Sequence, residues 1–146
     1  MAKINFNYIE SLRIPGAISL KRFLEEIVSD EKKELHQLNY IFCSDEYLLK
    51  INQDFLKHDV YTDIITFDLG NGTQINGEIY ISVDRVKENA AFYKSSSFKK
   101  ELFRVIIHGV LHLVGYGDKK KSESKVMRTK EDYYLLSFEE KFNVKL

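Results

Sequence analysis

Two histidines and one aspartate in the C-terminal half of the chain have the spacing of a metal site. His108 and His112 are four residues apart in the segment HGVLHLVGYGD, which ends at Asp118. Side chains four residues apart on a helix share one face, so the two imidazole rings can converge on one ion. The glycines at 115 and 117 suit the geometry that ends a helix, after which the chain can fold back toward that ion. The three residues therefore predict a zinc site.

The predicted site has the composition of catalytic rather than structural zinc. Two imidazoles and one carboxylate leave the fourth tetrahedral position to water, whereas structural sites are closed by four protein ligands. Water bound there has a lowered pKa and can supply hydroxide near neutral pH. The alternative is a buried histidine pair bonded to the backbone or to solvent, because this spacing also arises by chance.

The neighbouring residues favour an anionic substrate over a peptide. Metallopeptidases with the pattern H-E-x-x-H carry a glutamate after the first histidine, where this chain has Gly109. Arg104 lies one turn before His108, on nearly the same face, and can hold a phosphate beside the metal. Three lysines, at positions 119–121, follow Asp118 directly and can form a positive rim.

The overall charge balance conceals an uneven distribution. The chain has 22 basic and 22 acidic residues, but residues 85–130 hold 12 basic residues against four acidic ones, a net charge of +8. Such asymmetry can place a positive field on one face of a neutral protein and attract polyanions. The alternative is that solvated lysines simply cover the helices.

Length and composition indicate one domain and limit its class. The chain of 146 residues is suited to a single domain over residues 1–146. With Cys43 as its one cysteine, it can form no internal disulfide and no all-cysteine zinc site. No apolar run approaches the length of a membrane-spanning helix, and the N-terminus lacks the pattern of a signal peptide. We therefore expect a cytoplasmic protein with no membrane partner.

Hydrophobic periodicity predicts strands and helices that alternate early and only helices later. Four strands are predicted at residues 3–9, 40–43, 62–67 and 78–82. Five helices are predicted around residues 18–28, 45–55, 83–93, 98–114 and 122–142. Further signals are a cap at Ser44 or Asp45, a turn at Asn71-Gly72 and a break between helices at residues 95–97. The predicted fold is α+β: a mixed four-stranded sheet packed against about five helices, with the metal site at the end of a helix in the C-terminal half.

The segment from His108 to Asp118 resembles the signature of the YbeY family of bacterial endoribonucleases, H-G-x-L-H-L-x-G-Y-D-H. Nine positions match in order, counting the variable places. Upstream, Asn52 and residues 62–67 (TDIITF) are similar to the family's N-x-x-Y-R…T-D-V-L-S-F-P block, and residues 77–82 (GEIYIS) to its G-D-I-x-I-S strand. The blocks follow in the family's order over about residues 48–130.

The resemblance implies a zinc-dependent endoribonuclease, with one zinc ion per chain, that is selective for single-stranded RNA. It implies a role in 16S rRNA 3′-end maturation and ribosome quality control, with RNA and the ribosome as partners and no DNA expected. The resemblance also places His108, His112 and Asp118 at the metal-ligand positions of the family.

Two positions depart from the family pattern. Asp118 stands where the family usually has a histidine ligand, and Leu56 stands where it has an arginine thought to contact RNA or take part in catalysis. Lys57 and His58 are adjacent and could substitute, although lysine lacks the bidentate fork of arginine. The catalytic residue is therefore unassigned, with Lys57, His58 and Arg104 as candidates. Either water or the RNA 2′-hydroxyl could be the attacking group.

Two other functions remain alternatives. One is a non-catalytic ribosome assembly factor with a structural zinc site, which the absence of the arginine would suit. The other is a metallohydrolase that acts on a small or peptide substrate, which would turn over such a substrate and show no salt-dependent affinity for RNA.

Overall fold

The computed structural model describes residues 3–93 and 97–146, in which helices and strands follow the predicted order. The strands are β1 (Ile4–Tyr8), β2 (Glu34–Cys43), β3 (Ile64–Asp68) and β4 (Gln74–Ser82). The helices are α1 (Ala17–Asp30), α2 (Asp45–Leu56), α3 (Val83–Phe92), α4 (Phe98–Leu113) and α5 (Lys121–Phe142). Within the described residues, this is the predicted α+β fold with a mixed four-stranded sheet and five helices.

The sheet has the strand order β1-β2-β4-β3. The first three of these strands are parallel, and α1 forms the crossover from β1 to β2. β3 pairs antiparallel with β4, so that Ile64 lies opposite Ile81 and Asp68 opposite Gly77. β3 is an edge strand as a result, and its open side borders the cleft described below.

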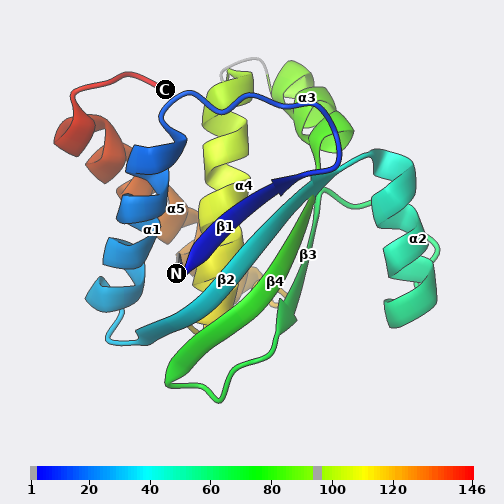
Figure 1. Ribbon diagram of the computed structural model, residues 1–146, viewed down its shortest axis with the longest axis horizontal. Coiled ribbons are helices and arrows are strands. Elements are labelled where there is room, and N and C mark those ends of the chain that lie inside the picture. Colours follow the sequence, from blue (N-terminus) through cyan, green and yellow to red (C-terminus); the bar gives the residue numbers. More distant parts are fainter. Residues whose placement is uncertain (1–2, 94–96) are drawn as a thin grey trace.

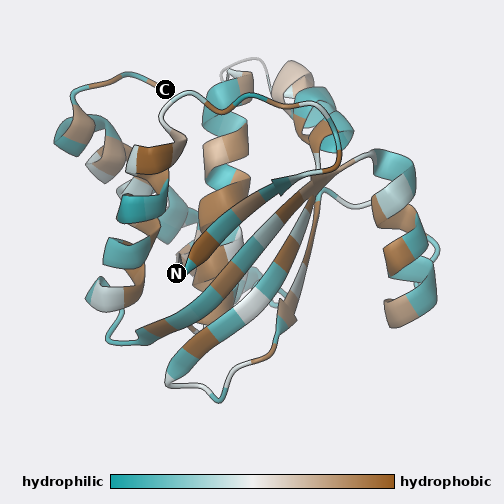
Figure 2. Cartoon of the chain, in the orientation of Figure 1, coloured by the Kyte–Doolittle hydropathy of each residue, from teal (hydrophilic) through white to brown (hydrophobic). Residues whose placement is uncertain are grey.

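Helices cover the two faces of the sheet unequally. In Figure 1, α1, α4 and α5 lie together on one side of the sheet, and α2 stands apart on the other. The larger core fills the first side, where β4 contributes Ile79 and Ile81 and α4 contributes Ile106 and Val110. A smaller cluster around Leu48 lies on the side of α2. Figure 2 shows the alternation of hydrophobic and hydrophilic residues along β2 and β4 that makes these two faces different.

Local sequence signals set the limits of several elements. Ser44 caps α2 by accepting a hydrogen bond from the Tyr47 amide, as its residue type predicts. The predicted turn at Asn71-Gly72 is confirmed, with Gly72 in the left-handed region at φ 90°. Of the predicted break at residues 95–97, positions 95 and 96 lie outside the described residues, and Ser97 is the N-cap of α4.

All four strands begin at residues other than the pattern predicted, and β1 differs least, since it starts at Ile4 rather than at residue 3. β2 starts at Glu34 rather than Tyr40, and β4 starts at Gln74 rather than Glu78. In both cases the missed residues are largely polar, because they lie where one face of the sheet is open to solvent and apolar content is a poor signal. β3 starts two residues later than predicted, at Ile64.

None of the helices in the described part of the chain combines the length and the apolar composition needed to cross a membrane.

Candidate metal centre

The two histidines lie on the last two turns of α4, the most deeply buried helix of the molecule. Both rings are partly exposed, with 20% of the His108 side chain and 25% of the His112 side chain accessible. Gly109, between them, lies against the sheet: a Cβ atom there would come within 2.8 Å of Ile79 Cδ1 and 3.2 Å of Ile64 Cδ1. The absence of a side chain at this position therefore lets α4 approach β3 and β4 closely.

A turn after α4 brings Asp118 back over the histidine pair. Gly115 adopts φ 119°, a conformation that other residues rarely take, and the Tyr116 amide donates to the carbonyl of Leu111. Ser124, on the first turn of α5, donates its hydroxyl to the carbonyl of Asp118 at 2.8 Å. The fold-back predicted from the glycines is confirmed.

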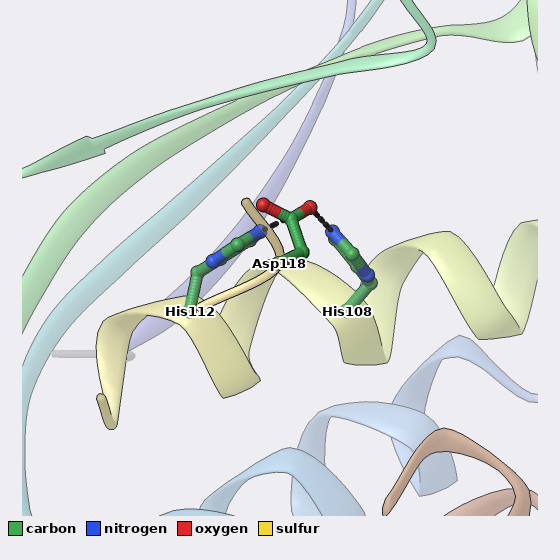
Figure 3. Close-up of side chains that lie close together, drawn as sticks. All are labelled: His108, His112 and Asp118. Carbon is green, nitrogen blue, oxygen red and sulfur yellow. Dashed lines mark hydrogen bonds and ion pairs between the residues drawn. The ribbon is translucent and has the colours of Figure 1, made fainter. Parts of the chain in front are cut away.

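The three side chains converge on one point, as Figure 3 shows. Asp118 Oδ2 lies 3.3 Å from His108 Nε2 and 3.2 Å from His112 Nε2. One ligand atom from each residue lies within 4.8 Å of the other two, a grouping that could hold a metal ion. Among the residues that the structure describes, no other group of three or more histidine, cysteine, aspartate or glutamate side chains lies close enough together to hold a metal ion.

Both histidines are oriented by hydrogen bonds at their other ring nitrogen. His108 Nδ1 lies 2.6 Å from Glu131 Oε2, and His112 Nδ1 lies 2.8 Å from the carbonyl of Tyr116. A carboxylate and a carbonyl oxygen only accept, so each Nδ1 must donate. In the neutral tautomer this leaves the lone pair of each Nε2 directed at Asp118. Two lone pairs and an acceptor-only carboxylate form a donor set that fits a cation, and bonds of this kind are typical around zinc ligands.

Glu131 lies on α5 and connects His108 to a buried ion pair. Its Oε1 accepts from Arg104 Nη1 at 3.0 Å, while Arg104 Nη2 lies 2.8 Å from Asp132 Oδ1. Arg104 and Glu131 are both buried. The guanidinium neutralises the carboxylate that holds His108, which is the arrangement a buried charge requires.

The electrostatic environment follows from these contacts. Burial alone would lower the pKa of His108, but the hydrogen bond and the charge of Glu131 raise it above its ordinary value. Burial raises the pKa of Asp63, and it also raises the pKa of Glu101 against the opposing charge of Arg104. Two carboxyl groups of raised pKa thus line the same cleft as the histidines.

The site opens into a cleft of about 960 Å³. The cleft runs along the open edge of β3, between the end of α2 on one side and α4 and α5 on the other. It is lined by Asn52, Leu56, His58, Val60, Thr62, Asp63, Ile64, Ile65, Thr66, Asp68, Asn89, Tyr93, Glu101, Arg104, Val105, His108, His112, Leu113, Asp118, Ser124, Met127, Arg128 and Glu131. An open cleft of this volume beside the histidines can take an extended substrate.

The catalytic candidates lie in different environments. Leu56 is the last residue of α2. Both Leu56 and His58 line the cleft. Lys57 is the C-cap of α2 at φ 57°, donates to the carbonyl of Asp54, and is not among the described residues that line the cleft. Arg104 lines the cleft, but its guanidinium is paired with Glu131 and Asp132. The sequence had led us to expect that this side chain would hold a phosphate, and it did not predict these two partners.

Sequence reasoning missed Glu131 and did not single out Asp63. Glu131 occupies the buried face of α5, at helical spacing with the buried residues Met127, Tyr134 and Leu135. A carboxylate on an otherwise apolar helix face is a signal that a buried cation or ligand pairs with it. That signal could have identified Glu131, although not His108 as its partner.

The chain is similar along most of its length to known proteins of one family. A family model described as Endoribonuclease YbeY matches residues 11–139. The chain is 46% identical over 140 residues to the Endoribonuclease YbeY of Flavobacterium psychrophilum, which covers 96% of this chain and 99% of that protein. It is 54% identical over 114 residues to the Endoribonuclease YbeY of Cytophaga hutchinsonii, covering 77% and 79% of the two chains. The solution structure of a Thermotoga maritima protein superimposes with a TM-score of 0.70 at 34% identity, covering 96% of this chain and 91% of that one.

Proposed function

Because the chain belongs to the YbeY endoribonuclease family, we propose that it is a zinc-dependent endoribonuclease that cleaves single-stranded RNA. Its substrate would be the precursor of 16S rRNA, at the 3′ end, and its wider role would be ribosome quality control in the cytoplasm. RNA and the ribosome are the partners, and DNA is not a substrate.

One observation carries the proposal: His108 Nε2, His112 Nε2 and Asp118 Oδ2 meet at the wall of an open cleft. Three protein ligands leave a coordination position free, which distinguishes catalytic from structural zinc. One zinc ion held there would polarise a phosphodiester oxygen or lower the pKa of a bound water. The residues around it hold the ligands in place and leave the cleft open for RNA.

Exposed cations beside the site support an RNA substrate. Lys119, Lys120 and Lys121 are exposed and follow the ligand Asp118 directly, and Arg128 lines the cleft from α5. We assign the contacts with RNA phosphates to these residues because their side chains are exposed, and Arg128 has only a long contact of 4.0 Å with Glu131. His58 lines the far side of the cleft and is the residue near Leu56 that remains a candidate for contact with the reacting group.

A second function has one observation in its favour. The family's arginine is replaced by Leu56, an apolar side chain that is 41% exposed at the cleft. A protein without a catalytic arginine could serve as a ribosome assembly factor whose zinc is structural. The open coordination position favours the enzyme over this alternative.

Metal analysis combined with cleavage of a single-stranded 16S rRNA fragment tests the proposal. We expect wild-type protein to contain about one zinc ion per chain and to cleave the fragment but not its duplex. His112→Ala should lose zinc and cleavage together. His36→Ala removes an exposed histidine on β2 and should change neither. Cleavage that persists in zinc-free His112→Ala protein would refute zinc catalysis, and zinc-loaded wild type that binds but never cleaves the fragment would favour the assembly factor.

A further inference from the structure

A second cluster of polar residues surrounds Glu31, the residue that follows α1. One carboxylate oxygen of Glu31 accepts from the Tyr116 hydroxyl at 2.6 Å. The other accepts from the Tyr134 hydroxyl at 2.5 Å and lies 3.2 Å from Lys130 Nζ. Segments that are 85 and 103 residues apart in the sequence therefore meet at one carboxylate.

The cluster is well ordered by its own contacts. The Glu31 side chain is only 12% exposed, and Lys130 Nζ lies 5.5 Å from the centre of the Tyr116 ring and 6.0 Å from that of Tyr134. Burial alone would raise the pKa of Glu31, but the hydrogen bonds from Tyr116, Tyr134 and Lys130 lower it. The carboxylate is therefore charged near neutral pH, and both of its oxygens accept hydrogen bonds.

Tyr116 connects this cluster to the metal centre. Its hydroxyl ends on Glu31, and its main-chain carbonyl accepts the hydrogen bond from His112 Nδ1 at 2.8 Å. The residue sits in the short segment between α4 and α5, next to Gly115 at φ 119° and two residues before Asp118. The Tyr116 amide is already bonded to the carbonyl of Leu111. The Tyr116 hydroxyl adds a second anchor, on the far side of the residue, through its bond to Glu31.

From this geometry we propose that Glu31 is a positioning residue of the metal centre. By fixing the Tyr116 hydroxyl, Glu31 holds the Tyr116 carbonyl where His112 Nδ1 can donate to it, and so keeps Nε2 directed at the ion. The inference rests on the proposed function only in requiring that the site bind zinc. Outer partners of zinc ligands fix the ring orientation and the tautomer, and their loss costs about 10–100-fold in metal affinity.

The chain offers matched controls for this pathway. Tyr134→Phe removes a hydroxyl from the same carboxylate but leaves the segment that carries the ligands untouched. Glu26→Ala removes another α1 carboxylate, one that is paired with Lys141 on the surface. If these contacts only stabilised the fold, substitutions at Glu31, Tyr116, Tyr134 and Glu26 would lower stability without a selective effect on zinc affinity. In the proposed pathway, zinc affinity depends on Glu31 and Tyr116 alone.

Zinc affinity, measured by competition with a chromophoric chelator, tests the proposal. We expect Glu31→Ala and Tyr116→Phe each to weaken zinc binding about tenfold, and the double variant to lose no more than either single variant, because both break the same link. Tyr134→Phe and Glu26→Ala should bind zinc as wild type does. In the cobalt-substituted protein, the d–d absorption bands should shift in the first two variants and not in the controls.

The outcomes separate this inference from the proposed function. Wild-type protein that binds no zinc would refute the zinc site itself. Tight zinc binding by wild type, with equal affinity in Tyr116→Phe, would overturn only the role of Glu31. The tyrosine variant decides the question by itself if Glu31→Ala does not fold, since it removes a single hydroxyl at a partly exposed position.

Discussion

Glu131 holds His108 by a hydrogen bond of 2.6 Å between its Oε2 and the histidine Nδ1, across 23 residues of sequence. The same carboxylate accepts from Arg104 through its other oxygen. The orientation of a predicted metal ligand on α4 therefore depends on a side chain of α5.

Replacing Glu131 with glutamine should weaken zinc binding about tenfold or more. The amide oxygen still accepts from one partner, but the negative charge that balances Arg104 is lost, so we also expect lower stability to urea. Isothermal titration calorimetry and urea unfolding measure the two effects. Glu140→Gln, at an exposed position of α5, is the control. Unchanged zinc affinity in Glu131→Gln would show that His108 keeps its orientation without this bond.

Zinc should stabilise the folded protein through its three ligands. A ligand present at 100 times its dissociation constant adds about 2.7 kcal/mol to the free energy of unfolding when it binds only the folded state. We therefore expect zinc to raise Tm and an excess of chelator to reverse the increase, as followed by circular dichroism. His36→Ala should respond like wild type, and Asp118→Ala should not respond. A zinc-dependent increase in Tm in Asp118→Ala would exclude this carboxylate as a ligand.

The stability of the protein should depend on pH through Glu31. The pKa of this carboxyl is lower in the folded state than its ordinary value of 4.5, so its contribution is present above pH 4.5 and is lost as the pH falls through the folded-state value. The difference in unfolding free energy between wild type and Glu31→Gln should therefore shrink between pH 6 and pH 3. Urea unfolding across this range measures it. A difference that stays constant would contradict the lowered pKa.

Adding a side chain at Gly109 should push α4 away from the sheet. Alanine gains roughly 1 kcal/mol in helix propensity, but its Cβ would lie 2.8 Å from Ile79 Cδ1 and 3.0 Å from Ile79 Cγ2. Overpacking of this kind costs about 2 kcal/mol, so we expect a net loss of about 1 kcal/mol in urea unfolding.

The neighbour of Gly109 provides the control. Ile79→Val removes the Cδ1 atom that would clash, so the double variant with Gly109→Ala should be more stable than the sum of the two single changes. If the two changes in unfolding free energy were strictly additive, α4 could shift to accommodate the new side chain. The contact with Ile79 would then not be the reason for a glycine at position 109.

Removing the lysines after Asp118 should weaken RNA binding in a salt-dependent way. Each phosphate contact with single-stranded nucleic acid contributes about 0.7 to the slope of log affinity against log salt. A triple alanine variant at 119–121 should therefore bind more weakly and lower the slope by up to about 2. Fluorescence anisotropy at several salt concentrations measures both. The control is the triple alanine variant of Lys32, Lys50 and Lys145, which removes the same charge from exposed positions that do not adjoin Asp118 in the sequence. Equal slopes in the two triple variants would refute a specific role for residues 119–121.

The sequence was most informative where the chemistry is local. The spacing of His108 and His112, with the nearby Asp118, predicted a convergent site. The three side chains do converge, and they lie within 11 consecutive residues of the chain. Apolar periodicity likewise predicted α4 and α5 with their buried residues, because helical spacing is a property of neighbours in sequence.

What the sequence could not predict are the contacts that join distant segments. Glu31 and Glu131 lie 85 and 23 residues from their partners at the site, and no spacing rule connects such pairs before the fold is known. The ion pairs of Arg104 were missed for the same reason, since its two carboxylate partners lie on another helix, α5. The polar starts of β2 and β4 were missed because their strand character comes from pairing with each other.

The dependence of His108 on α5 has a consequence for the order in which the molecule is completed. During synthesis, α4 leaves the ribosome before α5 does, and a nascent chain that ends before Glu131 has both imidazoles but not the carboxylate that aligns the first of them. The direct partner of the second histidine, the carbonyl of Tyr116, precedes α5 in the sequence, so this bond does not require α5. A site in which both imidazoles are aligned therefore requires α5 to have been synthesised and packed against α4.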